Sequence, residues 1–269
     1  MATKISAAAN PALANDIINK AFAEEQVFEA PKIIPPSDTT VELPGGYLTP
    51  AGEILRTAEV RELNGKDEEA IAKANNVGKA LMTILQRGTV RIGDQKVDEK
   101  LLDNLLSGDR DMLLLEIFKA TFGSEAELVA FCDGCQDMKT VNVDLTNEIK
   151  VKRLEDPIND RVFTVEGKRE EITVQLPTGA AQRELINSAE KTSAELNTIL
   201  LENTVVNIGS SPVYSKAQVQ NLGLVDRRKI IEEINARIPG PQFDPISVNC
   251  PECESEVLVP INLGTLFRL

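Results

Sequence analysis

Four cysteines are the residues whose types and spacing most clearly predict chemistry in this chain. They form two Cys-x-x-Cys pairs, and the 269 residues contain no other cysteine and no histidine. Two such pairs predict one tetrahedral zinc site, because two intervening residues let a tight turn direct both sulfurs at one cation. Four protein ligands leave no open position for water or substrate. We therefore expect one structural Zn²⁺ per chain, held by Cys132, Cys135, Cys250 and Cys253.

A redox-active disulfide is the alternative interpretation of a Cys-x-x-Cys pair. Strand-like segments flank both pairs, whereas a thioredoxin-like pair opens a helix. The first ten residues lack the apolar stretch of a secretory signal, which favours a cytosol-like compartment where disulfides are disfavoured. Zinc ligation is preferred on these grounds, and disulfide pairing and free thiols stay as alternatives.

Catalytic constellations are scarce. The absence of histidine excludes Ser-His-Asp and Cys-His catalysis. Acidic pairs at Glu68–Glu69, Asp109/Asp111 and Glu170–Glu171 could act as a general acid and base, but such charges are more often solvated helix faces or caps. We predict no enzyme, no catalytic residue and no cofactor-binding residue besides the metal ligands. A metal-stabilised enzyme that uses carboxylates is kept as an alternative.

The charge balance bears on partners. A net charge of −13 and a pI near 4.7 repel phosphate backbones and anionic lipid, and the longest basic run is Arg227–Lys229. No apolar run approaches the roughly 18–20 residues that span a bilayer. The sequence therefore predicts neither nucleic-acid nor membrane binding. Hydrophobic residues make up 42% and aromatic residues 4%, so the core should be mainly aliphatic.

An N-terminal arm, residues 1–40, is predicted to precede the globular body. Asn10 and Pro11 are typical of a helix start, and apolar residues recur with helical spacing as far as Phe28. Pro31–Thr40 has the composition of a linker. The arm could dock on a neighbouring subunit or pack on its own core, and both possibilities stay open.

Strands and helices are mixed through the rest of the chain, which predicts an α+β fold. Strands are expected at 41–48 (with a turn at 44–46), 54–63, 89–93, 127–131, 138–145, 150–154, 161–165, 171–176, 204–209, 245–249 and 257–263. Helices are expected at 67–88, 101–106, 109–123, 196–200, 218–222 and 226–238. The helix at 109–123 is apolar nearly all round and should be central and buried.

An internal repeat is indicated by landmarks at constant spacing. Glycines at 93 and 209 are 116 residues apart, aspartates at 109 and 226 are 117 apart, and both cysteine pairs are 118 apart. Val174–Gly179 also echoes Val41–Gly46 at a spacing of 133, which suggests an insertion in the first copy. We predict two related halves, 41–154 and 155–269, each with a small sheet, helices and one zinc knuckle. Neither half can complete a four-ligand site, so the metal should join them.

Three segments resemble the baseplate proteins of T4-type and related tailed bacteriophages. They are Leu43–Glu53 (LPGGYLTPAGE), Glu59–Leu63 (EVREL) and Gly108–Leu115 (GDRDMLLL). The resemblance covers residues 41–145 well, and the second half mainly through the repeat. It implies a virion or assembly protein that packs against other baseplate subunits and has no enzyme activity. It does not distinguish hub, wedge and assembly-factor roles.

The combined expectation is a structural subunit or assembly factor of a phage tail baseplate, stabilised by zinc. Its partners would be other baseplate and tail proteins, with several copies per virion. It would be assembled in the host cytoplasm and end in the virion. The alternative is an acidic zinc-ribbon adaptor that binds other proteins or nucleic acid in the cytosol.

Overall fold

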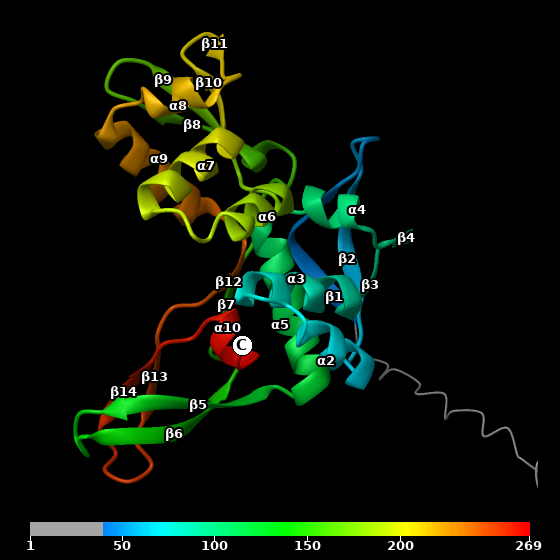
Figure 1. Cartoon of the computed structure of the whole chain (residues 1–269), viewed down its shortest axis with the longest axis vertical. Helices are drawn as coiled ribbons and strands as arrows, with labels where there is room; N and C mark the ends of the chain where they lie inside the picture. Colours follow the sequence, from blue (N-terminus) through cyan, green and yellow to red (C-terminus); the bar gives the residue numbers. More distant parts are fainter. Residues whose placement is uncertain (1–39) are drawn as a thin grey trace, which may run out of the picture. The chain divides into compact units, whose positions relative to one another are not determined.

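The computed structural model describes residues 40–269, which lie in one compact unit. The predicted N-terminal helix and nearly all of the linker lie outside the described residues. Figure 1 shows a mixed α+β arrangement in which small sheets alternate with helices along the chain. This confirms the predicted fold class at the level of α+β.

The first sheet is antiparallel, with strand order β1-β2-β3-β4. Its strands are β1 (Thr40–Leu48), β2 (Ile54–Val60), β3 (Thr89–Ile92) and β4 (Gln95–Lys96). Four helices belong to it: α2 (Gly65–Ile71) and α3 (Val77–Gly88) between β2 and β3, then α4 (Glu99–Asn104) and α5 (Ser107–Phe122) after β4. Asn64 and Asn76 accept hydrogen bonds from amides in the first turns of α2 and α3, which satisfies donors that a helix start leaves free.

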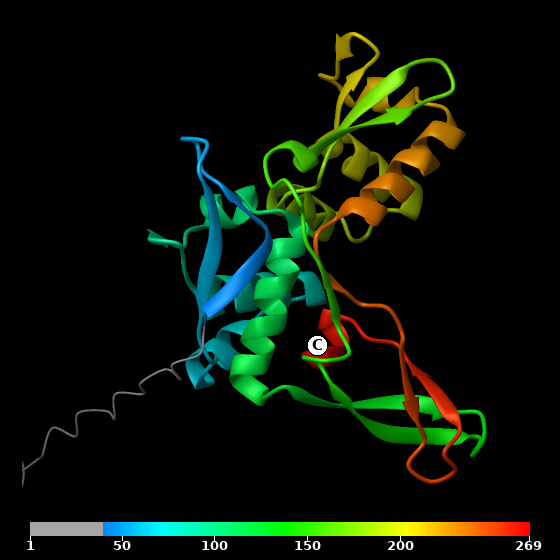
Figure 2. The same ribbon diagram turned by 180° about the vertical axis from the view of Figure 1, so that it is seen from behind.

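The central helix is α5. Nine of its sixteen residues are buried, and it packs on β1, β2, α3 and a later strand, β12 (Gly240–Gln242). Figure 2 shows α5 between the first sheet (blue) and the green and orange segments that cross beside it. The helix ends at Gly123, whose φ of 94° suits glycine. The predicted central, buried helix is therefore present.

The second sheet, also antiparallel, has strand order β8-β9-β10-β11. Its strands are β8 (Val162–Glu166), β9 (Glu171–Gln175), β10 (Val205–Ile208) and β11 (Ser211–Pro212), and a short 3-10 turn, η2 (Asn159–Arg161), precedes them. Its helices are α6 (Gly179–Asn187) and α7 (Ser193–Thr204) between β9 and β10, then α8 (Lys216–Gln220) and α9 (Leu224–Arg237) after β11. The order of elements matches that around the first sheet.

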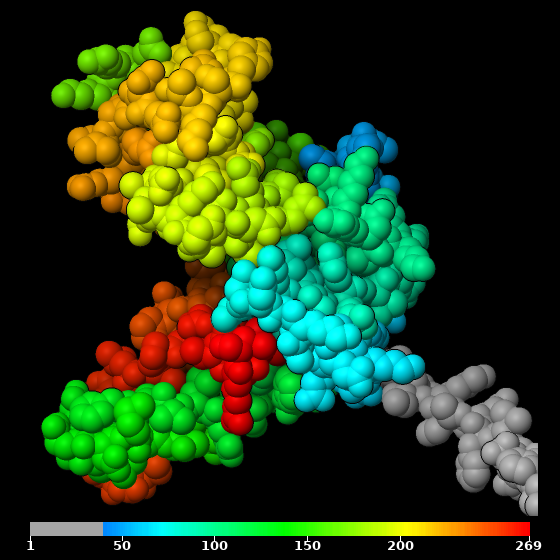
Figure 3. Space-filling view, in the orientation of Figure 1, coloured from blue at the N-terminus to red at the C-terminus, as the bar shows by residue number. Residues whose placement is uncertain are grey.

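Two cysteine-bearing hairpins complete the fold and together form what we call the ribbon. They are β5 (Glu125–Cys132) with β6 (Asp137–Asp144), and β13 (Ile246–Asn249) with β14 (Glu256–Val259). A further pair joins β7 (Lys150–Lys152) to β12 (Gly240–Gln242) across 88 or more residues of sequence. Helix α10 (Leu263–Leu266) contacts α5, α3 and β5, and Figure 3 shows this segment (red) against the ribbon and the α2–α3 region.

The hydrophobic core is divided among these parts. One cluster lies between the first sheet and α5, and another between the second sheet and its helices. A third fills the ribbon and includes Leu115 and Phe118 of α5, so the ribbon shares its core with the central helix. Burial of this aliphatic surface contributes roughly 25 cal/mol per Å² and is the main stabilising term.

Main-chain contacts join the start of α5 to distant segments. The Ser107 amide donates to the Pro177 carbonyl (2.9 Å), and the Gly179 amide donates to the Leu105 carbonyl (2.8 Å). A Cβ added to Gly108 would lie closer to the Pro239 carbonyl than any real Cβ contact. Glycine at 108 is therefore required by the close approach of two backbones.

Some local predictions are wrong. Residues 44–46 are not a turn but an irregular section inside β1, where the register with β2 shifts between Glu42 and Tyr47. The predicted helix at 67–88 is two helices, because Asn76 caps a new start. Val174–Gly179 does not occupy the place of Val41–Gly46: it runs from the second strand of its sheet into α6, whereas Val41–Gly46 lies in the first strand of the other sheet. The inferred insertion loses its basis.

Replacing Gly108 by alanine should destabilise the chain strongly. The added methyl group meets the Pro239 carbonyl, so α5 and the 238–240 segment must separate. We expect a loss of about 3 kcal/mol in the free energy of unfolding, measured by urea denaturation, or loss of soluble protein. Gly65→Ala is the matched control, because a Cβ there has open space. Equal stability of both variants would contradict this account of the contact.

Candidate metal centre

The four cysteines predicted as ligands come together at one end of the ribbon. Their sulfur atoms all lie within 4.8 Å of one another. The Sγ atoms of Cys132 and Cys253 are 3.5 Å apart, and those of Cys135 and Cys250 are 3.8 Å apart. A tetrahedral ion with 2.3 Å bonds to sulfur places its ligands about 3.8 Å apart, whereas a disulfide needs about 2.05 Å. The four thiols are free and could hold one metal ion.

Each hairpin supplies one pair of sulfurs from its turn. Cys132 is the last residue of β5 and pairs with Asp137, the first of β6. Gln136 and Glu254, one residue beyond the second cysteine of each pair, have φ of 56° and 59°. This left-handed residue folds the turn back toward the ligands. The Cys135 amide donates to the Cys132 sulfur (3.4 Å), which would help to stabilise a thiolate there.

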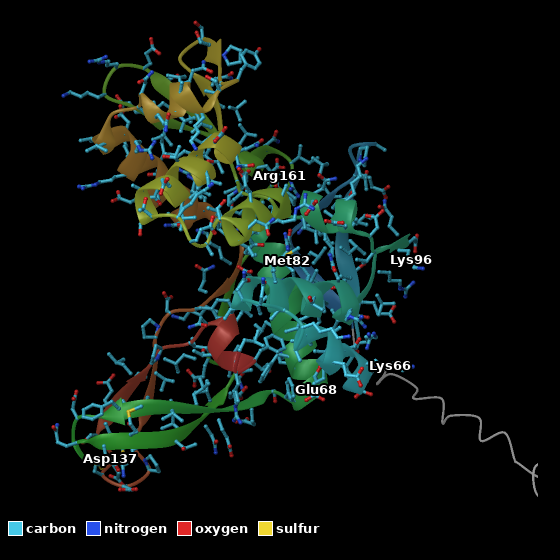
Figure 4. All side chains as sticks on the ribbon, viewed as in Figure 1. Lys66, Glu68, Met82, Lys96, Asp137 and Arg161 are labelled. Atoms are coloured by element: carbon cyan, nitrogen blue, oxygen red, sulfur yellow. The ribbon has the colours of Figure 1, made fainter. Side chains whose placement is uncertain are left out.

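The two turns approach each other closely. A Cβ at Gly134 would overlap the Ser255 hydroxyl and crowd the Cys253 sulfur, so the first turn needs glycine where it meets the second. Lys139 of β6 reaches across to Glu252 (2.7 Å) while also pairing with Asp137 (3.3 Å). Figure 4 labels Asp137 at this end of the ribbon. These contacts hold the two hairpins in register near the sulfurs.

The four cysteines differ in how far they are exposed to solvent. The first cysteine of each pair, Cys132 and Cys250, is 0% and 1% exposed and belongs to the ribbon core. Cys135 is half-buried and Cys253 is exposed. Hydrogen bonds from the Ser255 hydroxyl and amide lower the pKa of Cys253 to about 6, whereas hydrogen bonding to Cys253 raises the pKa of Cys135 to about 12. A bound cation would favour the thiolate form at all four positions.

This arrangement suits a structural role. All four donors are soft sulfurs, and four ligands fill a tetrahedral shell, so a bound ion has no position for substrate. Sequence reasoning identified the cysteines but missed Gly134, Lys139 and Ser255. The small residue at 134 is the one local signal that could have suggested the close approach of the turns.

The repeated Asp-Arg pair has a structural place. Asp109 is fully buried, and its Oδ1 accepts a hydrogen bond from the Gly45 amide (2.7 Å). Arg161 donates to the Gly45 carbonyl (3.1 Å) and to the Gly46 carbonyl. Figure 4 labels Arg161 and Met82 in the region where the first sheet unit meets α6. These residues pack β1, α5 and the start of β8 together.

Burial shifts the pKa values of Asp109 and Arg110 in opposite directions. Loss of solvation raises the pKa of Asp109 to about 6, against the lowering effects of the Gly45 amide and Arg161. Burial lowers the pKa of Arg110 to about 10, so its guanidinium stays protonated at neutral pH. Arg110 is 2% exposed and contacts the Met82 sulfur through Nη2. Asp109 and Arg110 therefore make buried contacts that connect α5 to β1 and α3.

The other candidate acids lie in different parts of the fold. Glu68 and Glu69 are exposed on α2, and Glu170 and Glu171 are exposed at the hairpin between β8 and β9. Asp111 accepts a hydrogen bond from Gln182 of α6 (3.2 Å). Within residues 40–269, no helix has both the length and the apolarity to cross a bilayer.

The class that the fold and the site define is an α+β protein with two small sheet units and a ribbon whose four clustered cysteines could bind a metal ion. Residues 38–268 match the family described as T4 bacteriophage base plate protein, and the chain belongs to that family. Comparison with curated proteins and with solved structures gives no match. The family match confirms the resemblance seen in the first half and extends it across the second.

Asp109→Asn should change how stability depends on pH. The folded-state pKa of Asp109, about 6, lies above its ordinary value of 3.8, so the folded state binds the proton more tightly. This group's contribution to stability is therefore full below about pH 4 and is lost as the pH rises through 6. The variant should be at least as stable as the wild type at pH 7.5 and should gain less stability on acidification to pH 5, by about 1.4 kcal/mol.

Urea denaturation at both pH values measures this difference. Asp94→Asn is the matched control, because it removes an exposed aspartate charge in the turn between β3 and β4. An Asp109 variant with the same pH dependence as the wild type would contradict the buried-carboxylate account.

Proposed function

We propose that this chain is a structural subunit or assembly factor of a phage tail baseplate, in a hub or wedge position. The observation that carries the proposal is the family match over residues 38–268. The closed four-sulfur cluster supports a structural rather than a catalytic role. Its partners are other baseplate and tail proteins, with several copies per virion and with neither nucleic acid nor membrane involved. Assembly takes place in the host cytoplasm, and the chain ends in the virion.

The ion in the four-sulfur centre is Zn²⁺ in this proposal, one per chain, bound by Cys132, Cys135, Cys250 and Cys253. Four thiolates in tetrahedral spacing are a typical structural zinc donor set. Each hairpin contributes two ligands, so neither completes the shell alone. Zinc thereby fixes the two hairpins to each other and stabilises the ribbon core.

We further propose that the chain is an internal duplication of two halves, 41–154 and 155–269. Support comes from the matching order of elements: each sheet has four strands in sequential order, two helices between the second and third strands, two after the fourth, and then a cysteine hairpin. The equivalent of β1 is then β8, and that of β2 is β9. No insertion in the first copy is needed.

Equivalent hydrogen bonds also support the duplication. Gly93 (φ 53°) donates to the Thr57 carbonyl at 2.7 Å, and Gly209 (φ 58°) donates to the Glu171 carbonyl at 2.8 Å. Asp226 accepts from the Lys168 amide at 2.9 Å, as Asp109 accepts from Gly45.

The arginines that follow these aspartates behave alike. Arg110 contacts Met82 of α3, and Arg227 donates to Thr198 of α7 (2.8 Å). Met82 and Thr198 are 116 positions apart, close to the spacing of 117 between the arginines. Side-chain contacts of this kind would be hard to retain in two unrelated folds.

The zinc assignment predicts about one zinc per chain in full-length protein purified without chelator. Cys132→Ser should lower the metal content well below one and lower the thermal midpoint, because a buried ligand is lost. Elemental analysis and thermal denaturation measure both effects. Val129→Ser, at an exposed site on the same strand, is the control and should keep its zinc. Wild-type protein with little zinc, after growth with zinc supplied, would overturn the assignment.

The baseplate role predicts that the chain is found with tail structures in cells producing the phage that encodes it. Mass spectrometry of gradient-purified tails should detect a structural subunit in finished baseplates. An assembly factor should instead be detected in incomplete baseplates. Purified free chain run on the same gradient is the control. Absence from both finished and incomplete baseplates would refute the proposal.

A further inference from the structure

The junction between the two halves buries the start of one long helix. In the first half this is the N-terminal turn of α5, where Ser107 is 5% exposed and Gly108 is buried. The covering segments come from the second half: Pro239–Gly240 lies against Gly108, and Thr178 bridges to Leu106. We call this buried helix start the covered face.

The equivalent face of the second half is open. Counting by the duplication proposed above, Leu224 and Val225 at the start of α9 stand where Ser107 and Gly108 stand on α5. They are 74% and 71% exposed, unusual values for large apolar side chains at neighbouring positions. Beside them is a cleft of about 610 Å³ lined by Lys168, Ile172, Leu222, Gly223 and Asp226, among others. We call this the open face.

The first half has its own equivalents of the covering residues Pro239–Gly240 and Thr178, and these equivalents are exposed. Phe122–Gly123 stand where Pro239–Gly240 stand, and both glycines have positive φ, 94° and 118°. The Phe122 ring packs on Phe118 (centroids 5.0 Å apart) but the residue is still 61% exposed, and nothing lies within 4 Å of a Cβ placed on Gly123. Asn64, which caps α2 in the place of Thr178 before α6, is also exposed. We call Phe122–Gly123 and Asn64 the free edge.

We propose that the open face of one chain binds the free edge of a second copy of the same chain. The contact inside the chain supplies the pattern: an edge of one half covers the helix start of the other. Two surfaces then have no partner within the described part of the chain: the open face of the second half and the free edge of the first half. Because they are different surfaces, the contact is head-to-tail and builds a ring or a filament.

The side chains differ from the internal junction in a way that suits a separable interface. Glycine at 108 permits backbone contact with Pro239, whereas Val225 cannot allow so close an approach. Between copies, the exposed ring of Phe122 would instead meet Leu224 and Val225 through side chains. Exposed apolar anchors of this kind are typical of the centre of a protein interface.

Charge sets the conditions for association. A net charge of −13 makes two copies repel each other at low ionic strength. Apolar contact should therefore dominate once salt screens the repulsion, and association should strengthen between low and physiological salt. This dependence is opposite to that of an interface held by ion pairs.

The test uses the full chain in sedimentation velocity over a concentration series at physiological salt. Wild-type protein should form species that grow with concentration. Phe122→Asp and Val225→Asp should each weaken this association about tenfold or more. Leu258→Asp, at a site on β14 that is 63% exposed, adds the same charge and should leave association unchanged.

Mixing the Phe122→Asp and Val225→Asp variants is the most specific test of the proposed contact. Each keeps the surface that the other has lost, so an equal mixture should form dimers and nothing larger. A mixture that stays monomeric, a monomeric wild type, or loss of association in the Leu258 variant would overturn the proposal. The proposal rests on the duplication but not on the zinc or the baseplate role. A monomeric chain that holds zinc and is found in baseplates would refute self-association and leave that function intact.

Discussion

The first turn of α5 must accept main chain from the far end of the sequence, and much of the fold depends on this constraint. Gly108 lets the 239–240 backbone reach the helix, and the Ser107 amide is satisfied by the Pro177 carbonyl. Asp109 beside them holds the irregular part of β1 through Gly45. A helix start has amides without partners inside the helix. Here, other elements of the chain provide some of the partners.

The ribbon depends on the same helix from its other end. Phe118 packs in the ribbon core, and Phe122 and Phe267 stack near it with ring centroids 5.0 and 5.3 Å from that of Phe118. The sulfurs lie at the far end of the hairpins, beyond the apolar residues of β5 and β14. The sulfur cluster and the aromatic contacts therefore lie at opposite ends of one structure, with an aliphatic core between them.

Sequence features with few possible structural roles could be interpreted correctly from the sequence alone. The cysteine pairs and the apolar run of α5 carry their structural meaning locally, and both are where the sequence predicted them. The irregular section at 44–46 was not predictable, because Pro-Gly-Gly is typical of a turn and the partner that keeps it in β1, Asp109, lies 64 positions away. The β7–β12 pair likewise has no local signal, since its strands are short and far apart. The capping asparagine at 76, by contrast, was a visible local signal of a helix start that the continuous helical pattern obscured.

The distribution of the four cysteines between the two hairpins has a consequence for synthesis. A ribosome releases the first hairpin long before the second, since Cys132 and Cys250 are separated by 118 positions. Until Cys250 emerges, the growing chain offers only half of the sulfurs. Closure of the sulfur cluster thus waits for translation of the second pair, and a chain truncated before Cys250 lacks half of the sulfurs. A full set of four sulfurs therefore marks a chain that has been translated at least as far as Cys253.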